Sequence, residues 1–365
     1  MELRIRLQHG VAYDLCLIIP KEELESCLLS FPYWEKLVHS YGYIRHPMAE
    51  IPEEVGLPAS HDPEEGWKPR AKGLRKYKLP PEEHLRRAGL LDEHGRPKKR
   101  LILIGNRNLG NNPGFVAWHR EKQPSFFHLK SDPVRESPYT CLVWYEEGFL
   151  SIEPILFKRE GDTFLPQRAS DGEPLKDRIT WCTFGQQVLR RGELVPIKEI
   201  IDQFYDIRHV LWFPTHAVGK TSCPEGEKDL LPIYNDYPRG FRDKALEELR
   251  AGRPRSRYLH NAVGIGRKEI IILQRHGTVE EIGHWLREAG AEDGLILDNG
   301  GSVFTWAWWT VRNEIKIGDK KVLRTGNVIF SAPDWRPPTI SLIAFVLHGP
   351  PRHVEPPRTI AMAMV

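Results

Sequence analysis

The chain has 365 residues, of which 40% are hydrophobic and 28% are charged. This apolar content supports one large or two ordinary folded domains and excludes disorder as the global state. The formal net charge of +3 is too small for the whole molecule to act as a polycation on nucleic acid or on an anionic membrane. Any basic surface therefore has to be local.

The opening residues scatter charges among apolar positions, which is unlike a secretory signal. No stretch reaches the roughly 20 apolar residues that a membrane-spanning helix needs, so we expect no membrane partner. The five cysteines are an odd number and include no C-x-x-C pair, which favours neither a disulfide framework nor a zinc ribbon. We expect the protein in the reducing cytoplasm.

The first hundred residues are predicted to form an N-terminal α/β extension. An alternating, strand-like run covers residues 1–7, and a helical pattern follows from Lys21 to Ser40, interrupted at Pro32. Between Gly66 and Arg100, 12 Lys/Arg stand against 4 Asp/Glu among several prolines. This composition favours a linker or an exposed basic arm.

Residues 101–365 are predicted to form a second domain that is rich in strands. Residues 101–105 and 113–118 have strand character, and two period-2 runs flanking the turn at 146–148 predict a hairpin. Helices are expected at 196–205 and 243–250, and a basic run at 239–257 marks an insertion around 200–257. The expected fold class is α+β, with a mixed, strand-rich sheet core and a few short helices.

The most informative segment lies between His260 and Ser302. Residues 268–275 have the pattern of a buried strand, and Thr278 with Glu281 forms a capping box that predicts the start of a helix. Apolar residues recur at helical spacing up to residue 289, and Gly290 supplies a stop signal. A second short strand, residues 294–297, then leads to Asp298.

Asp298 is followed by Asn299-Gly300-Gly301-Ser302, which predicts a sharp turn. A carboxylate at the end of a strand, beside glycine amides that converge on an anion, is one way to build a catalytic group next to a phosphate cradle. The same sequence is also typical of an ordinary hairpin turn. The alternating tryptophans at 306 and 308 that follow favour a core strand over a stacking surface for sugars.

The order of these pieces resembles the phosphodiester glycosidase family. The family's sequence runs approximately R-T-A-V-G, a strand, a short helix, G-A and then L-D-G-G-G-S. Here the matching stretches are residues 260–264, the helix from Thr278, residues 290–291 and residues 297–302. Downstream, Pro333, Arg336 and Pro337 match the family's closing pattern. The resemblance covers roughly residues 261–347.

The resemblance implies a hydrolase that cleaves a sugar–phosphate linkage of the sugar-1-phosphodiester type. Such cleavage passes through an oxocarbenium-like transition state, and phosphate is a good leaving group, so one well-placed carboxylate could suffice. Asp298 would be the nucleophile, base or cation stabiliser. The implied catalytic residues are Asp298, His260 and Asn261, and the implied substrate or phosphate contacts are Asn299, Gly300, Gly301, Ser302, Arg336 and His276.

Two departures from the family pattern bear on this activity. His260 and Asn261 stand where the family usually has Arg and Thr, and Asn299 replaces the first of three glycines. Either Arg336, Arg267 or His260 takes over the charge, with a changed substrate, or the activity is lost and a binding fold remains. His260 and His276 flank the strand at 268–275, where a histidine can act as an acid–base group or phosphate contact but is more often a surface or capping residue.

The alternative function is that of a catalytically altered member of this fold, which binds nucleic acid or another polyanion through basic arms at 66–100 and 239–257. Those arms are also open to the simpler reading of solvated loops. No cofactor is expected to be required, although a divalent cation such as Ca²⁺ at Asp298 is compatible with the sequence.

Overall fold

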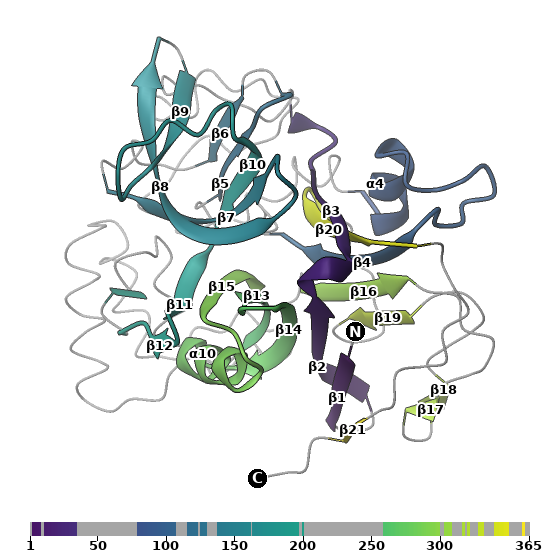
Figure 1. The fold of residues 1–365 in the computed structure, drawn as a ribbon. Helices are drawn as coiled ribbons and strands as arrows, with labels where there is room; N and C mark the ends of the chain where they lie inside the picture. Colours follow the sequence, from purple (N-terminus) through teal and green to yellow (C-terminus); the bar gives the residue numbers. More distant parts are fainter. Residues whose placement is uncertain are drawn as a thin grey trace, which may run out of the picture.

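The computed structural model describes residues 2–8, 11–34, 79–106, 115–122, 125–129, 137–161, 163–196, 199–200, 258–299, 303–308, 316–317, 320–321, 328–331, 339–349 and 360–361. These residues are mostly in strands, arranged as sheets of eight, six and five strands and a two-stranded ribbon (Figure 1). Two α-helices, α4 (Pro81–Arg87) and α10 (Val279–Glu288), lie in the described part of the chain. The expected α+β class is thus met only loosely, because the fold leans strongly towards β.

The eight-stranded sheet contains strands from both ends of the described chain. Its order is β12 (Glu193–Leu194), β11 (Gln186–Arg190), β15 (Asp293–Asn299), β13 (Tyr258–Ile265), β14 (Glu269–Gly277), β2 (Val11–Pro20), β1 (Glu2–Gln8) and β21 (Ile360–Ala361). The pair β1–β21 is parallel and the other pairs are antiparallel, so the sheet is mixed.

The six-stranded sheet has the order β6 (Phe126–Leu129), β5 (Phe115–His119), β10 (Ile179–Phe184), β7 (Tyr139–Tyr145), β8 (Leu150–Glu160) and β9 (Thr163–Arg168). Strands β7 and β8 form the predicted hairpin, which is confirmed. The edge strands β6 and β9 approach each other, so the sheet curls round a largely aromatic interior (Figure 1). There the ring centroid of Phe126 lies 4.9 Å from that of Phe157 and 5.0 Å from that of Phe164.

The five-stranded sheet has the order β19 (Val328–Ser331), β16 (Phe304–Trp308), β4 (Arg100–Gly105), β20 (Leu342–Leu347) and β3 (Leu24–Ser30). A separate ribbon pairs β17 (Lys316–Ile317) with β18 (Lys320–Lys321). Trp306 is 1% exposed and packs in the cluster on one face of this sheet, which confirms its assignment to the core.

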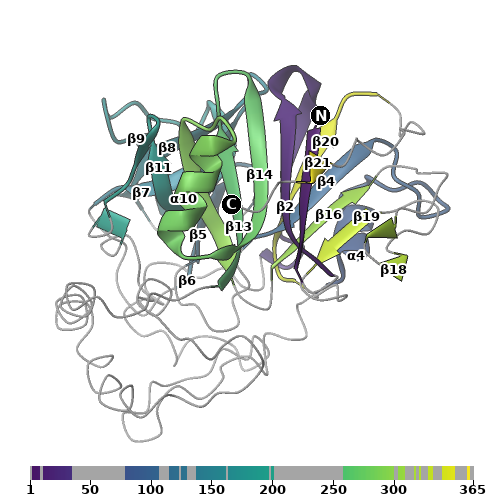
Figure 2. The same cartoon turned by 90° about the horizontal axis from the view of Figure 1, so that it is seen from below.

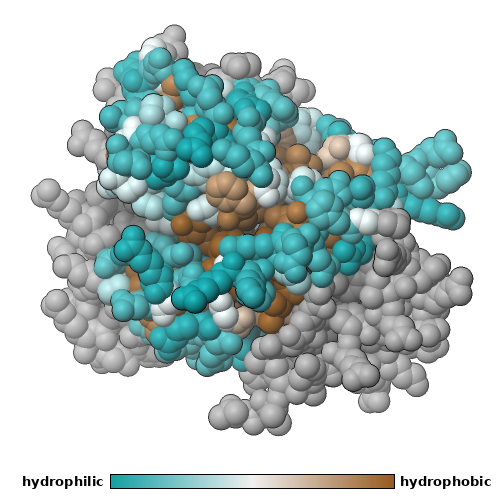
Figure 3. Space-filling model, in the orientation of Figure 1, coloured by the Kyte–Doolittle hydropathy of each residue, from teal (hydrophilic) through white to brown (hydrophobic). Residues whose placement is uncertain are grey.

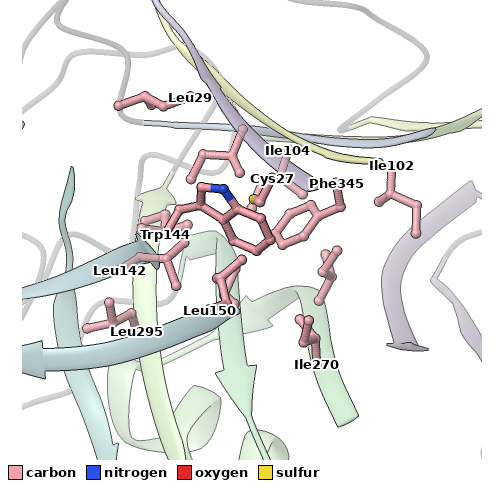
Figure 4. Close-up of a cluster of buried hydrophobic side chains, with 14 of the residues drawn as sticks. Cys27, Leu29, Ile102, Ile104, Leu142, Trp144, Leu150, Ile270, Leu295 and Phe345 are labelled. Atoms are coloured by element: carbon pink, nitrogen blue, oxygen red, sulfur yellow. The ribbon is translucent and has the colours of Figure 1, made fainter. Parts of the chain in front are cut away.

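The three larger sheets share one hydrophobic core. Its members come from all three, as Figure 4 shows for Trp144 of β7, Cys27 of β3 and Ile270 of β14. The indole Nε1 of Trp181 in β10 donates a hydrogen bond to the carbonyl oxygen of Cys27 at 2.9 Å. In the space-filling view, hydrophobic side chains form a band between the six-stranded sheet and the unit that carries α10 (Figure 3).

Helix α10 covers the other face of the eight-stranded sheet (Figure 2). The predicted capping box is confirmed: the Glu281 amide donates to Thr278 Oγ1 at 3.3 Å, and the Thr278 amide donates to Glu281 Oε2 at 2.8 Å. Gly264 of β13 and Gly294 of β15 lie opposite each other beneath the helix. A Cβ added at Gly294 would lie 2.6 Å from Leu286 Cδ1, so the helix can approach the sheet this closely only because both positions lack side chains.

The helix predicted from Lys21 to Ser40 is wrong for residues 21–30, and residues 35–40 lie outside the described part of the chain. Residues Lys21–Glu23 form a 3-10 turn, and Leu24–Ser30 form strand β3. Leu24, Cys27 and Leu28 have helical spacing, but β20 pairs along this segment, with Cys27 opposite Phe345. Pairing with a strand some 300 residues away outweighs the local pattern.

The expected boundary at residue 100 separates strands that share a sheet. Strand β2 pairs with β14, and β3 pairs with β20. Strands and the 3-10 turn make up residues 2–8 and 11–30. The division into units 1–100 and 101–365 as independent domains stays a prediction. The helices expected at 196–205 and 243–250, and the insertion at 200–257, lie outside the described residues apart from residues at their ends.

The interpretation of 66–100 as a linker or exposed arm is wrong for residues 79–100. Helix α4 buries His84 and Leu85 against the five-stranded sheet, and Leu79 bridges to Thr339. The Nδ1 atom of His84 is hydrogen-bonded to Ser30 Oγ at 2.9 Å. Its Nε2 atom lies 2.9 Å from the carbonyl oxygen of Thr339. Because charges and prolines dominate the composition of this segment, its sequence does not indicate that Leu79, His84 and Leu85 pack against the fold.

Candidate functional site

Asp298 lies near the end of β15, the strand that leads into the predicted glycine turn. Asp298 is 8% exposed, so this residue is largely buried and does not project into bulk solvent. Across the ladder Asp298 pairs with Asn261, while the next pair joins Ile296 to Ala262. Leu297 is therefore an extra residue, and the register shift is a β-bulge, a feature that re-aims side chains and is common beside functional sites.

Asn261 lies at the centre of a polar row that crosses three strands. Its neighbour on β14 is Gln274, and its neighbour on β15 is Asp298. Paired residues share a face of a sheet, so the three side chains lie on the side away from α10. Asn261 and Gln274 are completely buried.

The Asn261 carboxamide is bonded to the five-stranded sheet. Nδ2 donates to the carbonyl oxygen of Phe304 at 2.7 Å and to that of Gly105 at 3.4 Å. Oδ1 accepts a hydrogen bond from Thr305 Oγ1 at 3.3 Å. Both amide hydrogens and the amide oxygen of Asn261 thus have partners in strands β4 and β16.

A second carboxamide extends this polar region to the six-stranded sheet. Asn106 directly follows β4, and its Nδ2 lies 3.3 Å from Thr183 Oγ1 of β10 and 3.2 Å from Ser341 Oγ. Asn106 Oδ1 is buried and has no hydrogen-bond partner within the described residues. We call this set the three-sheet junction; its members are Asn106, Thr183, Asn261, Asp298, Thr305 and Ser341.

The three-sheet junction is unusual for the interior because its six polar side chains are only 0–8% exposed although they adjoin apolar strands. Five of them are amides or hydroxyls, and Asp298 is the only ionisable member. Amides and hydroxyls can hold the hydroxyl groups of a neutral ligand or orient a neighbouring carboxylate. Ladder pairing with Asn261 therefore places the Asp298 carboxylate on the same side of the sheet as these uncharged groups.

His260 lies on the opposite face of the sheet from Asp298. It pairs with Asn299 on one side and Arg275 on the other, and alternation turns its side chain towards the α10 face. His260 is 1% exposed, and its Nε2 donates to the carbonyl oxygen of Gly277 at 3.0 Å. The structure therefore brings together Asp298 and Asn261 but does not bring His260 to the same side.

His276 is half-buried at the end of β14. Its backbone amide donates to Asp14 Oδ1 at 3.0 Å. The other oxygen of Asp14 lies 3.6 Å from Arg275 Nε, and the guanidinium of Arg275 stacks on the Trp285 ring at 3.4 Å from its centroid. Arg275, which the sequence analysis did not single out, is thus held between β2 and α10.

Gly300, Gly301, Ser302 and Arg336 lie outside the described residues, and only the backbone of Asn299 is described. Arg267 is highly exposed and pairs with Glu292 at 2.8 Å. The phosphate cradle expected from the glycine amides and Arg336 stays a prediction.

In the described residues, no group of three or more His, Cys, Asp or Glu side chains converges as a metal site would require. A Ca²⁺ ion at Asp298 stays a prediction. Where the chain is described, no helix has the length and apolarity needed to cross a membrane.

The structure describes residues 79–100 of the first basic arm, where most Lys and Arg side chains contact other residues. Residues 79–100 carry six of the arm's 12 Lys/Arg and all four of its acids. Most of these cations have partners within the fold: Arg86 and Arg87 pair with Glu83, Lys98 donates to the carbonyl oxygen of Gly89, Lys99 pairs with Glu25, and Arg100 pairs with Glu23.

Sequence reasoning missed Asn106 and Thr305. Asn106 directly follows a predicted strand and opens an Asn/Gly-rich stretch, which is a signal for a polar group at a sheet end. Thr305 is a polar residue between the apolar positions of a predicted core strand. Neither signal indicates that Thr305 and Gly105, the residue before Asn106, meet Asn261, because these contacts join residues 44 and 156 positions apart.

No protein-family model matches the chain, and no curated protein sequence matches it. Among solved structures, one similar chain is the zebrafish N-acetylglucosamine-1-phosphodiester alpha-N-acetylglucosaminidase catalytic domain, auto-inhibited by its pro-peptide. The identity is 13% and the TM-score 0.38, covering 74% of this chain and 68% of that one.

Two further structures are similar at the same level. A hypothetical protein from Synechocystis is 9% identical with a TM-score of 0.32, covering 94% of this chain and 61% of its own length. A putative exported protein from Burkholderia pseudomallei is 10% identical with a TM-score of 0.36, covering 92% of this chain and 73% of that one.

Proposed function

We propose that the protein is a hydrolase that cleaves a sugar–phosphate linkage of the sugar-1-phosphodiester type, with Asp298 as its key carboxylate. The observation that carries this proposal is the position of Asp298: a largely buried carboxylate, set by a β-bulge at the end of a central strand, beside the amide and hydroxyl groups of the three-sheet junction. The motif around residues 260–302, which resembles phosphodiester glycosidases, supports the same chemistry.

In this proposal the carboxylate acts at the anomeric carbon. As the bond to the phosphate oxygen breaks, positive charge develops on the sugar ring, and an ionised Asp298 stabilises that charge or attacks the anomeric carbon directly. The phosphate leaves as an anion, so protonation of the leaving group contributes less than it does for an ordinary glycoside. The junction's amides and hydroxyls, which bond one another and the backbone, would hold the strands around the carboxylate in place.

The roles of the remaining predicted residues divide along the two faces of the sheet. Asn261 is proposed to act from the same face as Asp298. His260 would contribute only if the substrate reached the end of the sheet from the α10 side, whereas His276, two residues after Gln274 on β14, lies on the same face as Asp298. Gly300, Gly301, Ser302 and Arg336 remain the proposed phosphate and sugar contacts, together with Asn299.

The alternative, a polyanion-binding protein, draws less support from the described residues. Residues 79–100 carry six Lys/Arg against four Asp/Glu, so the described part of the arm has a net charge of only 6 − 4 = +2. For the compartment, the four described cysteines are free and buried, which is compatible with the proposed cytoplasmic location.

The test is a panel of sugar-1-phosphodiesters that differ in the sugar, with release of free sugar as the readout and the matching sugar-1-phosphomonoesters as controls. The proposal expects turnover of at least one diester at a rate well above that of its monoester. A panel without any sugar release, combined with salt-dependent retention on heparin, would favour the polyanion-binding alternative instead.

A further inference from the structure

A single side chain connects the strand that faces Asp298 to a different sheet. Asn261 belongs to the eight-stranded sheet, yet its carboxamide contacts Phe304, Thr305 and Gly105 of the five-stranded sheet, at 2.7, 3.3 and 3.4 Å. Asn261 and Thr305 are both completely buried. Hydrogen bonds in such surroundings are costly to break, because the separated groups cannot turn to water.

Thr305 determines which way the carboxamide of Asn261 points. A hydroxyl can donate to the carboxamide oxygen, and the two backbone carbonyls can only accept. With Thr305 Oγ1 on Oδ1, Nδ2 is directed towards the carbonyl oxygens of Phe304 and Gly105. Without the hydroxyl, the buried oxygen would lose its donor.

The position of Asn261 matters for Asp298 because the two residues pair at the β-bulge. A slip of one residue in a ladder turns every side chain to the other face of the sheet. Such a slip at β15 would move the carboxylate from the three-sheet junction to the α10 face. Whatever holds Asn261 in place therefore also fixes the side on which Asp298 emerges.

We propose that Thr305 and Asn261 are positioning residues, which clamp the first half of β13 to the five-stranded sheet and so hold Asp298 on the junction side of the bulge. The structural part of this clamp is independent of the reaction. Its catalytic meaning rests on the proposed function. Asn261 thereby acts through Asp298 rather than on the substrate.

The experiment measures hydrogen–deuterium exchange of the backbone amides of Asp293–Asn299 in the full-length protein. Thr305→Val removes the hydroxyl at nearly constant volume, and Thr305→Ser restores it. We expect exchange in this segment to rise about tenfold in the Thr305→Val and Asn261→Ala variants and to stay within about twofold of wild type in Thr305→Ser. Unchanged exchange in Thr305→Val would overturn the proposal.

A matched control is Ser30→Ala, which removes a buried hydroxyl bonded to His84 from edge strand β3 of the same five-stranded sheet. This variant should leave exchange of Asp293–Asn299 unchanged. An equal rise in Ser30→Ala would mean that the effect is general destabilisation, and the clamp would be refuted. If Asn261→Ala does not fold, the Val and Ser variants of Thr305 decide.

Activity provides a second readout with a distinct pattern. On whichever sugar-1-phosphodiester the wild type hydrolyses best, Thr305→Val should lower kcat about tenfold with KM within about twofold, and Thr305→Ser should restore kcat. If no diester is hydrolysed, the proposed function fails while the exchange result still decides the clamp. Turnover together with unchanged exchange would retain the function and reject the clamp.

Discussion

Asn261 and Asp298 lie opposite each other on strands β13 and β15, immediately beside the β-bulge at Leu297. One of them is tied to a neighbouring sheet by its side chain, and the other is the only ionisable group of the three-sheet junction. Their pairing turns two separate sequence signals, an asparagine near the start of one strand and an aspartate near the end of another, into one candidate site.

Replacing Asp298 with Asn should abolish hydrolysis of sugar-1-phosphodiesters without unfolding the protein. The amide keeps the volume of the carboxylate but cannot stabilise a developing positive charge or attack the anomeric carbon. We expect a loss of at least about 1,000-fold in kcat/KM, measured by sugar release, with a melting temperature within about 5 °C of wild type.

The matched control is Asp293→Asn at the other end of the same strand. Asp293 Oδ1 accepts a hydrogen bond from the Arg191 amide at 3.1 Å, and an asparagine oxygen can do the same. This variant should retain activity within a few-fold. Full activity in Asp298→Asn would remove the carboxylate from the mechanism.

Two buried histidines should make the protein less stable as the pH falls. Burial lowers the pKa of His84 to about 4, and burial with the nearby charges of Lys122 and Arg120 lowers that of His119 to about 4. The unfolded chain takes up a proton near pH 6.5, so between about pH 6.5 and pH 4 it binds more protons than the folded chain. The free energy of unfolding therefore decreases through this window and levels off below pH 4.

Urea unfolding at pH 7 and pH 5 measures this effect. His84 alone should account for a decrease of about 2 kcal/mol between the two values. In His84→Asn the decrease should be smaller but not absent, because His119 still titrates. An identical pH dependence in His84→Asn would show that His84 is not the neutral, buried group described above.

Removing the cap of α10 should cost about 1 kcal/mol of stability. In Thr278→Ala the amide of Glu281 loses its side-chain acceptor, whereas Thr278→Ser keeps it. Chemical denaturation should therefore distinguish the two variants by about 1 kcal/mol. Equal stability of the alanine and serine variants would mean that the cap contributes nothing measurable.

Trp181→Phe should destabilise the contact between the six- and five-stranded sheets. Its indole donates to the buried carbonyl oxygen of Cys27. The phenylalanine variant removes that donor and also creates a small cavity. We expect a loss of about 2–3 kcal/mol in urea unfolding. Trp144→Phe, in the same core cluster, should cost less because no such hydrogen bond is removed. A reversed order of the two variants would contradict this role for the indole.

Local signals were sufficient where neighbouring residues decide the structure. The hairpin β7–β8 and the unit β14–α10–β15 were predicted correctly, because strand alternation, the capping box at Thr278 and the stop at Gly290 act within a few residues. Trp306 was assigned to the core for the same reason. The resemblance to phosphodiester glycosidases also depends on this continuous segment.

The same local reasoning failed where the partner is far along the chain. Leu24, Cys27 and Leu28 favour a helix by spacing, and β20 made this segment a strand. Residues 79–100 have the composition of an arm, but His84 and Leu85 bury themselves against the five-stranded sheet. In both cases the free energy comes from burial and pairing with distant segments, which no local pattern records.

The sequence by itself determined the strands and the helix around Asp298 and the position of that carboxylate near the end of a strand. Only the tertiary structure decided which side of the sheet each neighbour occupies: Asn261 with Asp298, and His260 on the face of α10. The reason is the period of two along a strand, since one bulge or one residue of register reverses the face. Register is set by contacts between sheets, such as those of Asn261 with Thr305 and Phe304, that join residues far apart in the chain.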